Sequence, residues 1–267
     1  MQAASLPATS GWQWIRTGLQ LFLKQPLAMF AWSTVVGLFV LFAVLTLPIG
    51  PLLLPVLMPI VAMMSIAAAK HIEAGRTMLP SMWPKPLQLP GVFKKLTLMG
   101  VMYAVAVLIA EIVAVLPFTR DVVAGMELAT ASKDLAPMMA AMQQPLILFV
   151  ILYIPIAALF WHAPVLVGWH GLRMTQAMFF SGVACWRNKW AFLVYGVAWA
   201  MIFMFIDLAT GLMIAAGLPV TLVSTLQMPV NISACAVLYA SFYPAYASVF
   251  NIEDASANLD HRDGAHA

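Results

Sequence analysis

The segment "LPIGPLLLPVLMP" (residues 47–59) decides how the chain folds, because four prolines interrupt a long apolar run there. Pro48 and Pro51 flank a glycine, and a proline costs little at the first turn of a helix, so we expect a tight turn between two helices. Pro55 and Pro59 each leave a carbonyl one turn earlier without its backbone donor, which predicts a kink in the second helix. The segment therefore predicts a helical hairpin whose returning helix is bent.

The face that carries the prolines is expected to pack against protein, because lipid cannot satisfy the freed carbonyl groups. At 100° per residue the four prolines fall within a sector of about 80°, and Ala62, Ile66 and Ala69 continue the same stripe. Such a slim stripe lets a neighbouring helix approach closely. An unwound transport site would normally have a matching broken helix in the other half of the chain, and Pro155 and Pro219 do not match it. The prolines thus indicate helix packing.

The composition places the whole chain in a membrane. Of its 267 residues, 63% are hydrophobic and 9% are charged, whereas a soluble domain has roughly 25% charged residues. Cys185 and Cys235 are too few for a disulfide framework and match no metal-ligand spacing. The first 25 residues lack a short apolar core followed by a cleavage site, so we expect the first span to act as an uncleaved insertion signal.

Six apolar stretches reach the length of about 20 residues that a transmembrane helix needs. They are predicted near residues 26–47, 51–69, 96–118, 145–167, 191–216 and 229–250. We therefore expect an all-α, polytopic integral membrane protein, in which residues 1–251 form one bundle of six transmembrane helices with short interfacial amphipathic segments. The polar segment 252–267 lacks apolar periodicity and is expected to be a disordered cytoplasmic tail.

The distribution of basic residues predicts the orientation. With the N-terminus inside, eleven of the thirteen Lys and Arg residues lie on the inner side. These are Arg16, Lys24, Lys70, Arg76, Lys85, Lys94, Lys95, Arg173, Arg187, Lys189 and Arg262. The outer side holds Arg120 and Lys133, so the positive-inside rule places both termini in the cytoplasm. The basic residues then face anionic membrane lipids, and we expect no nucleic-acid partner because no folded basic domain is present.

Three aromatic segments with basic residues lead into spans, which suggests a weak internal repeat. They are "GWQWIRTGLQLFLKQP" (residues 11–26), "LPSMWPKPLQLPGVFKK" (79–95) and "GLRMTQAMFFSGVACWRNKW" (171–190). The first and third have helical apolar spacing, and the third places Trp186 opposite polar residues that include Asn188. The middle one contains four prolines, so we expect an interfacial coil anchored by Trp83. We favour the interpretation that these three segments anchor the ends of the spans at the membrane surface over the alternatives that they sense membrane curvature or dock a partner.

The first of these segments also carries a family resemblance. The stretch "GWQWIRTGLQLFLKQPLAMFAW" (residues 11–32) resembles the N-terminal region of a family of proteobacterial inner-membrane proteins with no assigned activity. In that family an interfacial helix with Trp precedes a basic residue, a proline and the first span. The length and the number of spans agree over the whole chain. The resemblance implies a six-span protein of the bacterial inner membrane, and it carries no functional residues over.

Three ionisable side chains inside the predicted spans are candidates for a polar intramembrane site: Glu111, Asp207 and His162. A charge inside a membrane costs at least about 2.5–3.5 kcal/mol on insertion scales, so each of these residues is a functional candidate by default. Glu111 and Asp207 are predicted at the same depth, where they would share a proton or bind a cation if their helices packed together. The alternative is that each carboxyl is protonated or hydrogen-bonded to a neighbouring helix. His162 lies near the inner end of its span.

Other candidates are weaker. Met138, Met139 and Met142 could offer thioethers to Cu(I), but the chain has 19 Met and a chance cluster is favoured. Tyr239, Tyr243 and Tyr246 recur at i, i+4 and i+7 near the inner end of the last span, where an interfacial aromatic belt accounts for them at least as well as a polar vestibule does. No protease, hydrolase or phosphate-binding motif is present, so we expect neither an enzyme nor a cofactor.

Two functions are compatible with these sequence features. The leading hypothesis is a non-enzymatic accessory or envelope-associated factor of the inner membrane. The alternative is a small-molecule or ion transporter or channel that uses the intramembrane carboxylates. A transporter needs a water-accessible polar path to those carboxylates, whereas an accessory protein needs a docking surface. The sequence does not specify a ligand, a membrane protein partner or the oligomeric state.

Overall fold

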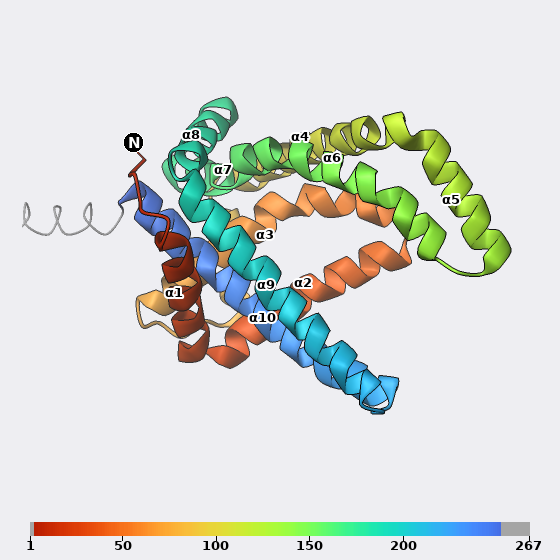
Figure 1. Cartoon of the computed structure of the whole chain (residues 1–267). Coiled ribbons are helices and arrows are strands. Elements are labelled where there is room, and N and C mark those ends of the chain that lie inside the picture. Colours follow the sequence, from red (N-terminus) through yellow and green to blue (C-terminus); the bar gives the residue numbers. More distant parts are fainter. Residues whose placement is uncertain (1–2, 252–267) are drawn as a thin grey trace, which may run out of the picture.

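The computed structural model describes residues 3–251, which are almost entirely helical and contain no strand (Figure 1). Its helices are α1 (Ser10–Lys24), α2 (Pro26–Leu45), α3 (Ile49–Glu73), η1 (Pro80–Met82), η2 (Lys85–Gln88), α4 (Val92–Val115), η3 (Leu116–Phe118), α5 (Thr119–Ser132), α6 (Ala136–Phe160), α7 (Ala163–His170), α8 (Met174–Arg187), α9 (Lys189–Ala215) and α10 (Val220–Phe250). The tail predicted over 252–267 lies outside the described residues.

Six helical segments of the described chain are long and apolar enough to cross a membrane. They are Pro26–Leu45, Ile49–Glu73, Val92–Ser132, Ala136–His170, Lys189–Ala215 and Val220–Phe250. The mean hydropathy of their most apolar windows ranges from 1.4 to 2.4. The prediction of an all-α polytopic membrane protein is confirmed.

The long helices form three hairpins, α2–α3, α4–α6 and α9–α10, which diverge from a common end (Figure 1). We call this common end the base, and the opposite ends of the hairpins the tips. Helices α1, α7 and α8 lie at the base, next to both ends of the described chain. The Ala4 backbone N–H donates to the Val249 carbonyl at 2.8 Å, so the two chain ends share this side.

The connection between the third and fourth predicted spans, residues 119–144, is largely helical. Helix α4 has 24 residues, which at 1.5 Å per residue span about 36 Å and already exceed the hydrocarbon core. The chain then turns at Pro117 in η3, and α5 folds back against α6. Gly125 of α5 permits this packing, because a Cβ there would lie 2.7 Å from the Cβ of Ala141.

The fourth span, expected to be continuous over 145–167, is broken near the base. Helix α6 ends at Phe160 and α7 begins at Ala163, with a bend at Trp161 and His162. Pro164 lies in the first turn of α7, where its missing N–H removes no helical hydrogen bond. The proline therefore starts a new helix here instead of continuing the old one.

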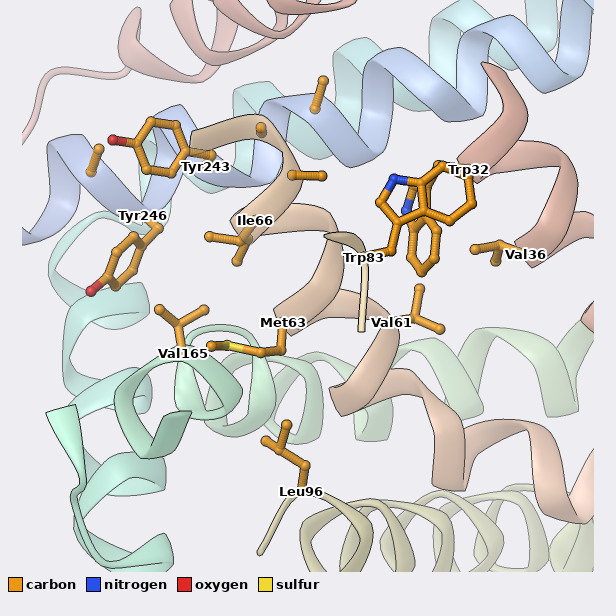
Figure 2. Packing of buried hydrophobic residues seen from close by; sticks show 14 of the residues in the cluster. Trp32, Val36, Val61, Met63, Ile66, Trp83, Leu96, Val165, Tyr243 and Tyr246 are labelled. Carbon is orange, nitrogen blue, oxygen red and sulfur yellow. The ribbon is translucent and has the colours of Figure 1, made fainter. Parts of the chain in front are cut away.

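Helix α3 lies at the centre of the base and packs against α2, α4, α7 and α10. Figure 2 shows its side chains Val61, Met63 and Ile66 surrounded by residues of the other elements. The Trp32 indole N–H donates to the Ser65 hydroxyl at 2.9 Å and ties α2 to α3. A helix in this position has to present small or apolar side chains on most of its circumference, as α3 does.

The proline stripe of α3 is only partly buried. Pro59, Ile66 and Ala69 are buried, Pro55 is half-buried, and Pro51 is exposed near the tip. The expectation that this face turns toward protein thus holds for the half nearer the base. Toward the tip the hairpins separate, and the stripe loses its neighbours (Figure 1).

Two expectations for the interfacial segments need correction. Trp83 is 8% exposed, and its ring lies edge-on to Trp32 with centroids 5.2 Å apart, because the turns η1 and η2 fold it back onto the core. Asn188 is 1% exposed and does not face solvent. Its amide donates to the Ala4 carbonyl at 2.9 Å and accepts the Leu6 N–H at 2.8 Å. It supplies hydrogen-bond partners to the half-buried N-terminal backbone.

Close backbone contact between α3 and α4 gives a stability prediction. A Cβ at Gly100 would overlap the Val56 carbonyl oxygen, so Gly100→Ala should lower the thermal unfolding midpoint by several degrees, equivalent to about 1–3 kcal/mol. The control is Gly196→Ala in α9, where an added Cβ meets nothing within 4 Å and alanine favours the helix. Circular dichroism in one detergent measures both midpoints. Equal midpoints for the two variants would contradict the close approach.

Candidate functional site

A cavity of about 190 Å³ lies where the three hairpins separate. Its walls come from α3, α4, α6, α7 and α10, so each of the three hairpins contributes at least one helix, whereas α2 and α9 contribute no lining residue. Pro59, Ala62 and Ile66 of the proline stripe form one wall. The remaining lining residues are apolar or aromatic, and none of them is charged. The prolines predicted to serve packing therefore also shape a cavity inside the membrane-spanning region.

Two tyrosines provide a polar group within this cavity. The hydroxyls of Tyr103 in α4 and Tyr153 in α6 are hydrogen-bonded at 2.6 Å. Phe160 supports the pair, because its ring centroid lies 5.1 Å from that of Tyr103. Tyr239 of α10 lines the cavity from another hairpin. Sequence reasoning missed the pair, since the residues are 50 positions apart; the available hint was that a Tyr inside an apolar span needs a partner for its hydroxyl.

The structure does not bring the two predicted carboxylates together. Glu111 lies toward the tip of α4 and Asp207 toward the tip of α9, and both are exposed on the protein surface. Their helices belong to different hairpins, which diverge (Figure 1). Asp207 accepts a hydrogen bond of 2.9 Å from the Gln227 amide of α10. This is the bond to a neighbouring helix that the alternative interpretation described.

His162 lies at the break between α6 and α7 and has an exposed fraction of 0%. Its ring is surrounded by aromatic side chains, with centroids 5.3 Å from Phe250 and 5.8 Å from Phe192. Neither ring nitrogen has a hydrogen-bond partner among the described residues. The His162 backbone N–H donates to the Ser181 hydroxyl at 2.9 Å, and that hydroxyl donates to the Ala158 carbonyl at 2.7 Å. Ser181 of α8 therefore bridges the break.

The methionines proposed for Cu(I) lie in the first two turns of α6. Met138 and Met142 share one face of that helix, and Met139 is 69% exposed on the surface. Within residues 3–251, no group of three or more His, Cys, Asp or Glu side chains could hold a metal ion. A copper site at these methionines stays a prediction.

A second pocket, of about 200 Å³, lies at the base and is lined by basic residues. Lys70, His71 and Arg76 contribute to it, and the Lys70 ammonium lies 4.6 Å from the ring centroid of Trp169. Gln25 positions the adjoining loop, because its side chain donates to the Arg76 carbonyl at 2.7 Å. This pocket is electrostatically suited to an anionic lipid headgroup.

Two other residues at the base are buried and structural. Tyr246 has an exposed fraction of 0%, so it belongs to the core instead of an interfacial belt, and its hydroxyl lies 2.6 Å from the His170 ring nitrogen. Burial raises the pKa of the Cys185 thiol to about 12. A buried thiol that stays protonated is a poor nucleophile and metal ligand, which agrees with a packing role for Cys185.

A comparison with known proteins identifies one relative across nearly the whole chain. Over 264 residues the chain is 30% identical to a probable inner membrane protein of Burkholderia thailandensis, which covers 96% of this chain and 97% of the relative. No family model matches the chain, and no solved structure matches it. The relative's name gives a location and no activity.

The hydrogen bonds at the α6–α7 break predict opposite effects for two substitutions. Ser181→Ala leaves the His162 N–H and the Ala158 carbonyl without partners, and should cost about 1–3 kcal/mol of unfolding free energy. His162→Phe removes two unpaired ring nitrogens and should leave stability unchanged or raise it. Ser233→Ala, whose exposed hydroxyl donates to the Pro229 carbonyl one turn earlier in α10, is the control. A loss for His162→Phe as large as that for Ser181→Ala would show that the imidazole holds a partner.

Proposed function

The chain belongs to the same family as this inner-membrane protein of Burkholderia thailandensis, and we propose that it is a non-enzymatic accessory factor that works through contacts of its membrane-embedded surface. The observation that carries the proposal is the divergence of the hairpins (Figure 1). Between 11% and 44% of the residues in the most apolar window of each span are buried inside the chain. Most of the spanning surface is therefore free to contact lipid or other helices.

The tips of α9 and α10 present the most open part of this surface. Four leucines there are each about half exposed: Leu208, Leu212, Leu222 and Leu226. Exposed leucines alone do not distinguish a partner helix from lipid, but Gly211 of α9 has nothing within 4 Å of an added Cβ, and small residues of this kind let two membrane helices approach closely. The α9–α10 tip is thus the favoured docking surface for a helix of another membrane protein or of a second copy.

The separation of the ionisable residues also favours an accessory role. A coupled transporter needs polar groups gathered along a water-accessible path. Glu111 and Asp207 lie in different hairpins, and the cavity between the hairpins has no charged lining residue. The interior therefore lacks the gathered charged groups of a coupled transporter, and the outer surface offers the features on which an accessory role can act.

We further propose that the base faces the cytoplasm. Lys70, Arg76 and Lys189 lie at the base, whereas Arg120 and Lys133 lie toward the tips. This distribution follows the positive-inside rule and would bring the basic pocket of the base to anionic lipids of the inner leaflet. Membrane lipids would then be the protein's partners at this end.

Reporter fusions test the proposed orientation. Green fluorescent protein joined after Ala267 should fluoresce, and alkaline phosphatase at the same place should be inactive, because the former matures in the cytoplasm and the latter outside it. Alkaline phosphatase inserted after Gly217, in the turn between α9 and α10, should be active. The reverse pattern would place the base outside.

Site-specific photocrosslinking tests the accessory role. A photoreactive residue at Leu212, 62% exposed at the α9 tip, should give a protein adduct of fixed mass in native membranes. The matched position is Phe179, 64% exposed on α8 at the base, where lipid adducts are expected. Overexpressing the unlabelled chain should reduce the adduct by competition for the same partner. Lipid adducts alone at both positions would reject the docking proposal.

The transport alternative rests on the Asp207–Gln227 hydrogen bond, which places a polar pair between two spanning helices. Purified protein in liposomes would then catalyse a saturable, pH-dependent flux. The double variant Glu111→Gln, Asp207→Asn would abolish that flux, because it removes both titrating carboxyls. Flux that survives in the double variant would exclude these residues from any transport mechanism.

A further inference from the structure

The cavity between the hairpins is not used by the proposed function, which concerns the outer surface. We propose that this cavity binds a neutral, ring-headed membrane lipid with carbonyl acceptors, of the isoprenoid quinone class. The proposal rests on the depth of the cavity, on its hydrogen-bond donors and on its lining.

The depth of the cavity excludes headgroups that stay at the membrane surface. Tyr239 lies 11 residues before Phe250, the last residue of α10 at the base, which corresponds to about 16 Å along the helix axis. Tyr103 lies 11 residues after Val92, where α4 starts at the base. Both residues therefore lie near the middle of a hydrocarbon core of about 30 Å. The ring of an isoprenoid quinone, being uncharged, can enter this region.

The tyrosines of the cavity carry hydroxyl groups whose hydrogens are available to donate to a ligand. In the Tyr103–Tyr153 pair one hydroxyl donates to the other, so the accepting hydroxyl keeps a hydrogen without an acceptor among the described residues. Tyr239 likewise has no hydrogen-bond partner for its hydroxyl in residues 3–251. Water is scarce at this depth, and an unpaired hydroxyl in hydrocarbon is costly. A ligand that supplies hydrogen-bond acceptors would pair with the free hydroxyl hydrogen of the Tyr103–Tyr153 pair and with the Tyr239 hydroxyl.

The arrangement of these donors fits a quinone better than other lipids. The tyrosine pair belongs to the α4–α6 hairpin and Tyr239 to α10, so the donors come from two different hairpins. A para-quinone carries its carbonyl acceptors on opposite sides of one ring. Fatty acids and phospholipids carry an anionic group, which this uncharged cavity would leave unpaired.

The size and lining of the cavity suit a planar ring. Its volume of about 190 Å³ exceeds the roughly 150 Å³ that admits benzene in a protein core. Phe160, Trp161 and Phe242 line it with aromatic faces and edges, against which a ring packs favourably. The cavity is partly open and not fully enclosed, so an isoprenoid tail can extend from it.

Binding of a defined probe tests the proposal. The full chain in quinone-free phosphatidylcholine nanodiscs is titrated with a ubiquinone that carries a geranyl tail, and quenching of tryptophan fluorescence is recorded, since Trp161 lines the cavity. We expect saturable binding of the quinone. Geraniol, which has the tail without the quinone head, and dioleoylglycerol, a neutral ester lipid, should not compete. Absence of saturable quinone binding, or equal binding of either competitor, overturns the proposal.

Substitutions of residues that line the cavity test whether the quinone binds there. The double variant Tyr103→Phe, Tyr153→Phe keeps the rings and removes the hydroxyl pair, so it should weaken quinone binding about tenfold. Tyr246→Phe is the matched control, because it removes a hydroxyl bonded to His170 and does not line the cavity. Ala62→Phe fills the cavity and should abolish binding with the hydroxyls intact. Wild-type affinity in either the double variant or Ala62→Phe contradicts the assignment.

Discussion

The packing of α3 against its neighbours at the base is the interaction on which the rest of the structure depends. The Trp32–Ser65 hydrogen bond fixes α2 to α3, and the absence of a side chain at Gly100 lets α4 reach the α3 backbone. Lipid provides no hydrophobic force that would press helices together, so close packing and hydrogen bonds of this kind have to hold them. The Trp32–Ser65 bond lies near the base, whereas Gly100 meets Val56 in the tip half of α3, so the α2–α3 and α4–α6 hairpins remain joined beyond the base.

Away from the base the same principle explains why the hairpins part. The tips carry large apolar side chains such as Leu208 and Leu212, which lipid solvates as well as protein does. Divergence leaves two features within the membrane: an open surface along each hairpin, and an aromatic cavity near Tyr103 where the hairpins begin to separate. The accessory role uses the first of these features, and the proposed quinone site uses the second.

Local patterns in the sequence predict the six spans and the helical turn at Pro48, because apolar length and proline position depend on neighbouring residues alone. They do not predict the burial of Trp83, because it follows from a tertiary contact with α2. Pro164 was a local signal for the break at His162, but the uninterrupted apolar run around it predicted a continuous span. Glu111 and Asp207 were predicted at the same depth in the membrane, but equal depth does not determine which helices pack together, and their helices belong to different hairpins. The tyrosine pair was missed for the same reason.

Disulfide trapping in native membranes tests the divergence of the hairpins most directly. In a chain whose two native cysteines are replaced by alanine, Glu111→Cys with Asp207→Cys should give no intramolecular disulfide, because a disulfide needs Cα atoms within about 7 Å. Ala4→Cys with Val249→Cys serves as the positive control and should oxidise readily, because the 2.8 Å hydrogen bond from the Ala4 N–H to the Val249 carbonyl holds the two backbones within disulfide range. Efficient bridging of positions 111 and 207 would contradict the account and restore a shared carboxylate site between the hairpins.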